Sequence, residues 1–333
     1  MDWERRCLRL CGAILLCAVG LRLASGGALT PLVRALDHPE AASFLIYLHT
    51  GRVVRMGQTP VAPTEPEPPE TVPESTAPTA AVEKLTFDAD DAALVGVTYN
   101  CGLRPDFESL LTRPLEWNLR SGEPSVLILH PHTTESYTKT DQDSYTESSP
   151  YRTLEPDHNM LAVGDLVAEL LEEAGIAVIH DQIFHDYPSY NGSYDHAAAS
   201  TREILAEYPS IQLILDLHRD AADTAYGQMV TQCSVGGETS AQLMMVVGTD
   251  AGPLDHPDWE RNLALALKLQ VLLETENPGI CRDLNLTAQR YNQHLGNLAL
   301  LIEVGAAGNT MAEAKLAAVQ LAEAIIRLAE GSA

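Results

Sequence analysis

Histidine and carboxylate side chains follow three apolar segments of this 333-residue chain, and together they could bind a metal ion. The first segment runs into H-P-H-T-T-E, the second into D-L-H-R-D and the third into L-I-E-V-G. Neutral imidazole and carboxylate groups are the ligands of catalytic zinc, which takes three protein ligands and keeps a fourth position for water. The three motifs therefore predict a hydrolytic zinc site, with Zn²⁺ as cofactor.

The ligand set follows from residue type and spacing. His132 and His218 are the first choices as zinc ligands, and Glu135 is the third because it lies close to His132. Glu155, just ahead of an expected helix, is an alternative third ligand, and the residues alone leave the choice open.

A catalytic base is expected at Glu303, which stands alone at the end of an apolar strand. Desolvation there would raise its pKa toward the range that a general base needs to activate water. Asp216 precedes His218 by two residues, hence on the same strand face, and could orient the imidazole. Glu303 is thus the predicted catalytic residue.

Three residues next to the predicted ligands are not expected to bind the metal or to act as the base. His130 is separated from His132 by Pro131 and is expected to support the site or to pack. Arg219 is expected to support the site or to face the substrate, and it is also interpreted as a local ion pair with Asp220. Taken singly, a histidine at a strand end is more often structural, and His158, His180, His256 and His294 are interpreted that way; only the convergence of three strand ends favours a metal.

The elements that must position these residues alternate between strand and helix. Apolar runs predict strands at 126–129, 176–179, 211–215, 243–247 and 298–304, and helical spacing predicts helices at 160–174, 196–208, 259–276 and 310–328. Such alternation predicts an α/β fold, a mostly parallel sheet with helices on both faces in a single catalytic domain. Sites in such sheets lie beyond the C-terminal ends of strands.

The N-terminal quarter has a different composition. Residues 1–28 carry an arginine cluster before a short apolar run and are expected to be a membrane anchor, with a cleaved signal peptide as the competing interpretation. Residues 29–56 form a juxtamembrane segment, 57–83 a Pro/Glu/Thr-rich linker and 84–333 the catalytic domain. The arginines precede the apolar run, which predicts a single-pass cell-membrane protein with its catalytic domain outside the cytoplasm.

Charge and cysteine content exclude other classes. The formal net charge of −25 opposes binding to nucleic acid. Cys101, Cys233 and Cys281, the cysteines beyond the apolar run, form no C-x-x-C pair, so neither a disulfide framework nor a cysteine zinc site is expected.

Several longer motifs resemble the stage II sporulation protein P family from about residue 124 to the C-terminus. They are V-L-I-L-H-P-H-T-T-E-S-Y, H-D-Y-P-S-Y-N-G-S-Y, P-S-I-Q-L-I-L-D-L-H-R-D-A and L-L-I-E-V-G-A-A-G-N-T-M-A-E-A. The wider zinc-dependent N-acetylmuramoyl-L-alanine amidases are similar more loosely. By this resemblance His132 and His218 correspond to zinc histidines and Glu303 to the catalytic glutamate, whereas the branch motif favours Glu135 and the wider amidases favour Glu155.

The resemblance also implies a biological setting. It implies hydrolysis of the amide between N-acetylmuramic acid and L-alanine in peptidoglycan, with endopeptidase activity on cross-links also attributed to the branch. It implies action during septum thinning and engulfment, with a lytic transglycosylase, stage II sporulation protein D, and septal membrane proteins as partners. The competing hypotheses are a non-catalytic peptidoglycan-binding module and a zinc peptidase acting only on cross-links.

Overall fold

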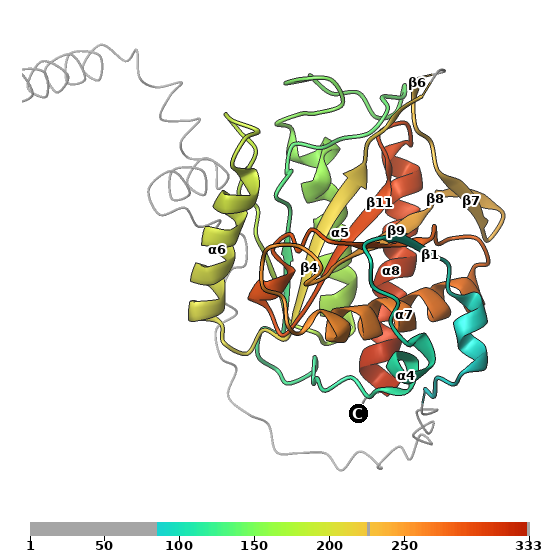
Figure 1. The fold of residues 1–333 in the computed structure, drawn as a ribbon. Coiled ribbons are helices and arrows are strands. Elements are labelled where there is room, and N and C mark those ends of the chain that lie inside the picture. Colours follow the sequence, from blue (N-terminus) through green and yellow to red (C-terminus); the bar gives the residue numbers. More distant parts are fainter. Residues whose placement is uncertain (1–84, 225–226, 332–333) are drawn as a thin grey trace, which may run out of the picture. The chain divides into compact units, whose positions relative to one another are not determined.

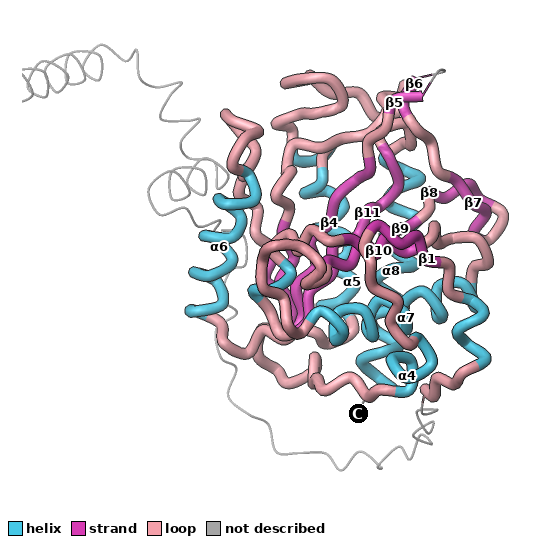
Figure 2. Tube along the Cα trace, viewed as in Figure 1, coloured by secondary structure: helices cyan, strands magenta, loops and turns pink. Residues whose placement is uncertain are grey.

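A computed structural model describes residues 85–224 and 227–331, and its central feature is a seven-stranded sheet (Figures 1 and 2). The strands are β1 Val97–Asn100, β2 Val126–Leu129, β3 Val178–His180, β4 Leu213–Asp220, β5 Asp223–Thr224, β6 Gly227–Gln228, β7 Gln232–Val235, β8 Glu238–Ala241, β9 Leu243–Gly248, β10 Leu284–Thr287 and β11 Leu298–Ala306. The α-helices are α4 Phe107–Thr112, α5 Met160–Glu173, α6 Ser193–Glu207, α7 Trp259–Glu276 and α8 Met311–Gly331.

The sheet is mostly parallel. Its strand order is β1-β10-β9-β11-β4-β2-β3. Strands β11 and β9 pair antiparallel, whereas every other pair of neighbours in this sheet is parallel. Short hairpins, β5–β6 and β7–β8, stand outside it. The expected α/β class with a mostly parallel sheet is confirmed.

Side chains of the central strands alternate between two cores. Val126, Leu213 and Leu300 point into the large core with α5, α7 and α8. Leu127, Ile214 and Ala299, with the opposite parity, join a much smaller cluster that includes Ala197 of α6. Successive residues of a strand face opposite sides of the sheet, so these two clusters lie on its two faces. Helices therefore cover both faces, and fewer apolar side chains pack on the α6 face.

That parity decides where the polar residues of the strands lie. Asp216 and His218 follow Ile214 at intervals of two on β4, and Glu303 follows Ala299 at an interval of four on β11. All three side chains therefore emerge on the α6 face, where few apolar side chains compete for space.

Helix α5 shows how local signals set the element boundaries. Asn159 caps its N-terminus by accepting a hydrogen bond from the backbone N–H of Leu161 at 2.9 Å. Gly175 follows its C-terminus with a φ of +79°, a conformation that favours glycine and ends the helix. The expected helix and its glycine stop are confirmed.

Two differences from the expected elements affect the site. Strand β4 continues to Asp220, so the D-L-H-R-D motif lies within the strand rather than beyond its end. Likewise β11 continues two residues beyond its expected end at 304, to Ala306. Hydrogen-bonded pairing with each other keeps both strands extended past their apolar runs. Strands β1 and β10, helix α4 and both hairpins were not expected at all.

The expected anchor, juxtamembrane segment and linker lie outside the described residues. The described residues all belong to one compact unit. Within the described ranges no helix combines the length and apolar character needed to cross a bilayer.

Candidate metal centre

Three adjacent strands bring the three motifs together. Strand β4 lies between β2 and β11, and its Asp216 is the register partner of Leu129 at the end of β2. His218 is the register partner of Glu303 on β11. The H-P-H-T-T-E segment follows β2 directly, so its side chains reach the same place.

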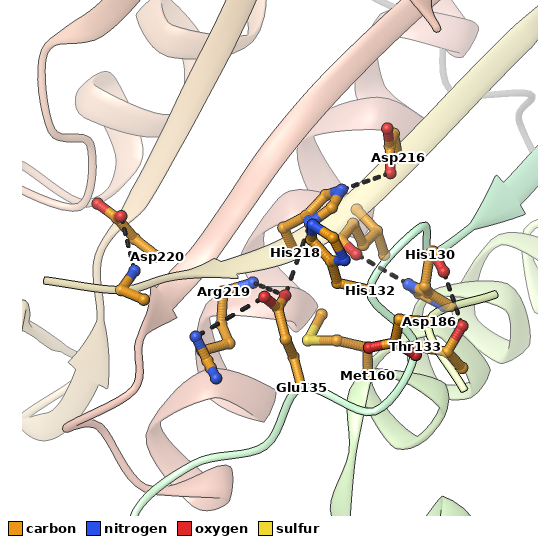
Figure 3. A network of polar contacts seen from close by, with 12 residues as sticks. His130, His132, Thr133, Glu135, Met160, Asp186, Asp216, His218, Arg219 and Asp220 are labelled. Carbon is orange, nitrogen blue, oxygen red and sulfur yellow. Dashed lines mark hydrogen bonds and ion pairs between the residues drawn. The ribbon is translucent and has the colours of Figure 1, made fainter. Parts of the chain in front are cut away.

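His218 lies between two carboxylates (Figure 3). Its Nδ1 is 3.5 Å from Oε2 of Glu135, and its Nε2 is 2.8 Å from Oδ1 of Asp216. Burial acts to lower the pKa of His218, but Asp216 and Glu135 outweigh it and raise the pKa well above its ordinary value. The two carboxylates therefore favour the protonated form of His218.

His132 lies next to His218 but has a different environment. The two ring centroids are 5.4 Å apart and nearly perpendicular. The Tyr190 hydroxyl is 3.2 Å from Nε2 of His132, and Oγ of Ser193 is 3.3 Å from its Nδ1. Burial lowers the pKa of His132 to about 4, so its imidazole is neutral at pH 7, the form that binds metal.

Glu135 is held as an anion by two arginines. Burial alone would raise its pKa, but the charge of Arg219 and the hydrogen bond with His218 outweigh burial and lower the pKa to about 2. Arg152 Nη2 donates to Oε1 at 3.1 Å, and the backbone N–H of Arg219 donates to Oε2 at 3.3 Å. The carboxylate is thus fixed and ionised, as a metal ligand must be.

Glu303 has the opposite character. Burial raises its pKa to about 8. Its Oε2 is buried and has no hydrogen-bond partner among the described residues. The expected upward shift at Glu303 is thus supported, and the group is suited to exchange a proton near neutral pH.

Glu155, the alternative third ligand, lies elsewhere. Its Oε1 accepts a hydrogen bond from the backbone N–H of Thr146 at 2.9 Å, its Oε2 is 4.0 Å from Nε2 of His158, and 46% of its side chain is exposed. The structure therefore brings Glu135, and not Glu155, into contact with His218.

His130 faces away from the two candidate ligand histidines. Its Nδ1 donates to the backbone carbonyl of Leu217 at 2.9 Å, so its Nε2 accepts from Nε2 of His180 at 2.8 Å. Nδ1 of His180 is 2.9 Å from Oδ1 of Asp165. His130 is fully buried, and its contact with Leu217 fixes the residue before His218.

The expected local ion pair between Arg219 and Asp220 is wrong. Adjacent residues on a strand point to opposite faces. Asp220 instead pairs with Arg282 at 2.7 Å, while Arg219 Nη1 lies 3.7 Å from Oε1 of Glu135.

Four further residues adjoin this site without having been predicted for it. Arg152 Nη1 donates to Oδ2 of Asp186 at 2.6 Å while its Nη2 binds Glu135. The ring of Tyr190 stacks on His132 at 4.5 Å, and that of Tyr194 stacks on His218 at 6.1 Å. No local pattern in the sequence distinguished Arg152.

A family model described as stage II sporulation protein P matches residues 58–326, most of the chain. The chain belongs to this family. Stage II sporulation protein P of Bacillus subtilis is 29% identical over 209 residues, which cover 58% of this chain and 48% of that protein. The chain thus spans about half the length of the curated relative it matches.

Solved structures with some likeness to this family member include three amidases. The N-acetylmuramoyl-L-alanine amidase AmiC2 of Nostoc punctiforme has a TM-score of 0.36 at 15% identity, covering 61% of this chain and 94% of that one. The CwlD amidase of Clostridioides difficile, in complex with the GerS lipoprotein, has a TM-score of 0.33 at 16% identity, and the match covers 62% of this chain and 95% of that one. The amidase Ami1 of Mycobacterium smegmatis has a TM-score of 0.37 at 12% identity, and the match covers 65% of this chain and 98% of that one.

The candidate ligands of this family member suit a zinc ion in their chemistry, and two of them, His218 and Glu135, also suit it in spacing. Two ligands of a tetrahedral zinc, bound at about 2.0–2.1 Å, lie about 3.3 Å apart. Nδ1 of His218 and Oε2 of Glu135 are 3.5 Å apart. Within the described ranges, however, no group of three His, Cys, Asp or Glu side chains is placed to hold a metal ion, and both ring nitrogens of His132 lie near hydroxyls. His132 would have to turn away from these hydroxyls to serve as the third ligand.

Proposed function

We propose that this chain is a zinc-dependent peptidoglycan hydrolase that cleaves the amide between N-acetylmuramic acid and L-alanine during septum thinning and engulfment. Membership of the stage II sporulation protein P family supports the setting. The observation that carries the chemistry is the position of His218, which lies between Glu135 and Asp216 and is the register partner of Glu303.

His132, Glu135 and His218 are the residues that would hold the ion. A bound zinc ion would supply Lewis-acid activation of water and of the amide carbonyl. Oδ1 of Asp216 lies 2.8 Å from Nε2 of His218, on the far side of the ring, and would orient the imidazole. Arg152 and Arg219 hold Glu135 in place from the opposite side.

Glu303 would move the proton. Its unpaired Oε2 takes a proton from the attacking water and returns it to the nitrogen of the leaving L-alanine. Burial raises the pKa of Glu303 to about 8, whereas a nearby cation favours its ionised form. The Glu303 carboxyl group can therefore both accept a proton and give it back near neutral pH.

The cellular setting belongs to the same proposal. Residues 1–28 would anchor the chain as a single-pass membrane protein, and the acidic 57–83 linker would let the catalytic domain reach wall strands outside the bilayer. Stage II sporulation protein D and septal membrane proteins are the proposed partners. Cleavage of peptide cross-links is a proposed additional activity.

Analysis of reaction products tests the proposal. The full chain, supplied with zinc, is incubated with purified peptidoglycan, and the released fragments are identified by mass spectrometry. Stem peptides with a free L-alanine amino terminus are expected from the wild type, and roughly 10²-fold or more slowly from Glu303→Gln. Glu330→Gln, an exposed carboxylate paired with Arg120, serves as the matched control that keeps the wild-type rate.

Two other outcomes would refute the amidase. Release of fragments cut only at peptide cross-links would indicate a zinc peptidase. Binding of the wall without release of fragments, with zinc bound to the protein, would indicate a binding module.

A further inference from the structure

Beside the metal centre, residues 181–190 form a loop that points polar side chains inward and apolar side chains outward. Asp181, His185 and Asp186 are 3–6% exposed. Ile183, Tyr187 and Tyr190 are 56%, 53% and 54% exposed. This is the reverse of the usual distribution, in which large apolar side chains are buried and charged ones are exposed.

The buried carboxylates fix the loop to its surroundings. Asp181 accepts hydrogen bonds from Ser200 Oγ at 2.6 Å and from the backbone N–H of Ile183 at 3.1 Å. Asp186 accepts from both the backbone N–H and Oγ1 of Thr134, at 3.1 and 2.6 Å, and from Arg152 at 2.6 Å. The outward side chains are therefore carried on a well-anchored backbone, as recognition loops are.

The exposed side chains are concentrated here. Three of the seven large apolar side chains exposed in the described part of the chain lie in these ten residues. Tyr190 also contacts the metal centre, since its ring stacks on His132 at 4.5 Å and Arg152 lies 4.8 Å from the centroid of the same ring. Exposed apolar side chains grouped beside a reactive site mark a surface that binds a ligand.

We infer that Tyr187 and Tyr190, with Ile183, form a binding site for the sugar rings of a glycan strand next to the scissile amide. The inference rests on the proposed function, whose substrate joins sugars to peptides. Sugar rings present apolar C–H faces rimmed by hydroxyl groups, which suit a tyrosine ring with its hydroxyl.

Two features favour the glycan over other ligands. The charged groups Asp181 and Asp186 are already paired inside the protein, so the loop directs no carboxylate or cation from these positions toward a charged stem peptide. A partner protein covering Tyr190 would also cover His132 and obstruct the site. A neutral, extended sugar chain fits both constraints.

Direct binding to separated halves of the substrate tests the inference. The full chain carrying Glu303→Gln is titrated with glycan strands freed of stem peptides and, separately, with free stem peptide. Tyr187→Ala and Tyr190→Ala should each weaken glycan affinity roughly tenfold, since an aromatic contact of this kind contributes about one such factor. Leu254→Ala, which removes a side chain that is 55% exposed outside the loop, should leave affinity unchanged.

Zinc affinity is measured for every variant, which distinguishes a loss of glycan binding from damage to the metal centre. Tyr187→Ala should keep the zinc affinity of the parent protein, which excludes general damage to the site. Unchanged glycan affinity in both tyrosine variants, an equal loss in Leu254→Ala, or tyrosine-dependent binding of stem peptide alone would overturn the inference. Tyrosine-dependent glycan binding by a protein that cuts no amide would instead refute the proposed function and leave the glycan site standing.

Discussion

Glu303 on β11 and His218 on β4 are direct register partners in neighbouring parallel strands. Neighbouring strands lie about 4.8 Å apart, and both side chains emerge on the same face of the sheet. Strand pairing, rather than a loop, therefore sets the position of the proposed base relative to a proposed metal ligand. Such a rigid arrangement suits a proton transfer that depends on distance.

The raised pKa of Glu303 predicts how the stability of the metal-free protein depends on pH. Burial raises the folded-state pKa to about 8 from an ordinary value of 4.5. Between these values the folded state holds a proton that the unfolded state has lost, so Glu303 favours folding below the ordinary pKa and this contribution is lost as pH rises through about 8. Glu303→Gln, which mimics the protonated form, should therefore become more stable relative to the wild type by up to about 3–4 kcal/mol between pH 5 and pH 9.

Urea denaturation in the presence of a chelator, at several pH values, measures this difference. Glu330→Gln is the control, because its side chain is 40% exposed, and its difference from the wild type should stay nearly constant over the same range. A Glu303→Gln difference that does not change with pH would show that Glu303 is ionised throughout and not desolvated.

The fold class and the set of converging residues could be predicted because they depend on local patterns. Continuous apolar runs identified β2, β4 and β11, and the polar residues at the ends of those runs identified His132, His218 and Glu303. The edge strand β1 has only four residues, with alternating partial exposure, and β10 carries the polar Asn285 and Thr287. Their strand conformation comes from pairing with distant segments, which no local pattern records.

The supporting residues of the site could not be predicted for a related reason. Arg152 reaches Glu135 across 17 positions and Asp186 across 34, through contacts created only by folding. The pairing of Arg219 was wrong because the strand was expected to end before it. The choice between Glu135 and Glu155 also required three-dimensional distances.

The contact between Glu135 and His218 predicts which carboxylate binds zinc. Glu135→Gln removes an anionic ligand and should weaken zinc binding at least about 100-fold, because the remaining histidines provide only two ligands. Glu155→Gln should keep wild-type affinity, since its contacts are with Thr146 and His158. Competition with a chromogenic chelator measures both. Loss of zinc in Glu155→Gln with retention in Glu135→Gln would reverse the assignment.

Arg152 is expected to act as a positioning residue for Glu135. It bridges Oε1 of Glu135 at 3.1 Å and Oδ2 of Asp186 at 2.6 Å, with 17% of its side chain exposed. Arg152→Met keeps much of the side-chain volume but frees both carboxylates, so zinc affinity should fall about 10–100-fold, as when other groups that orient metal ligands are removed.

Arg152→Lys separates charge from geometry, because a lysine restores the charge but cannot bridge two carboxylates in the same plane. It should recover only part of the lost zinc affinity. Arg120→Met, which breaks an exposed pair with Glu330, is the control and should bind zinc normally. Wild-type zinc affinity in Arg152→Met would show that Arg219 alone positions Glu135.

The close approach of α5 to two buried histidines predicts an effect opposite to helix propensity. Alanine in place of Gly164 would ordinarily stabilise a helix by up to about 1 kcal/mol. Its Cβ, however, would lie 2.5 Å from Nε2 of His180 and 2.6 Å from Nε2 of His130. Since His130 is fully buried and cannot move freely, Gly164→Ala should instead destabilise the protein by about 1–3 kcal/mol.

A double-mutant cycle with His180→Ala attributes this cost to the histidine pair. Removing the His180 ring relieves one of the two close approaches, so Gly164→Ala should cost less in that background, with a coupling of about 0.5–3 kcal/mol in urea denaturation. Ala168→Gly in the same helix is the control for propensity and should destabilise by roughly 1 kcal/mol in both backgrounds. If Gly164→Ala instead stabilises the protein by the helix-propensity amount, the two histidine rings must be able to move away from α5 at little cost, and the close approach to Gly164 would not constrain them.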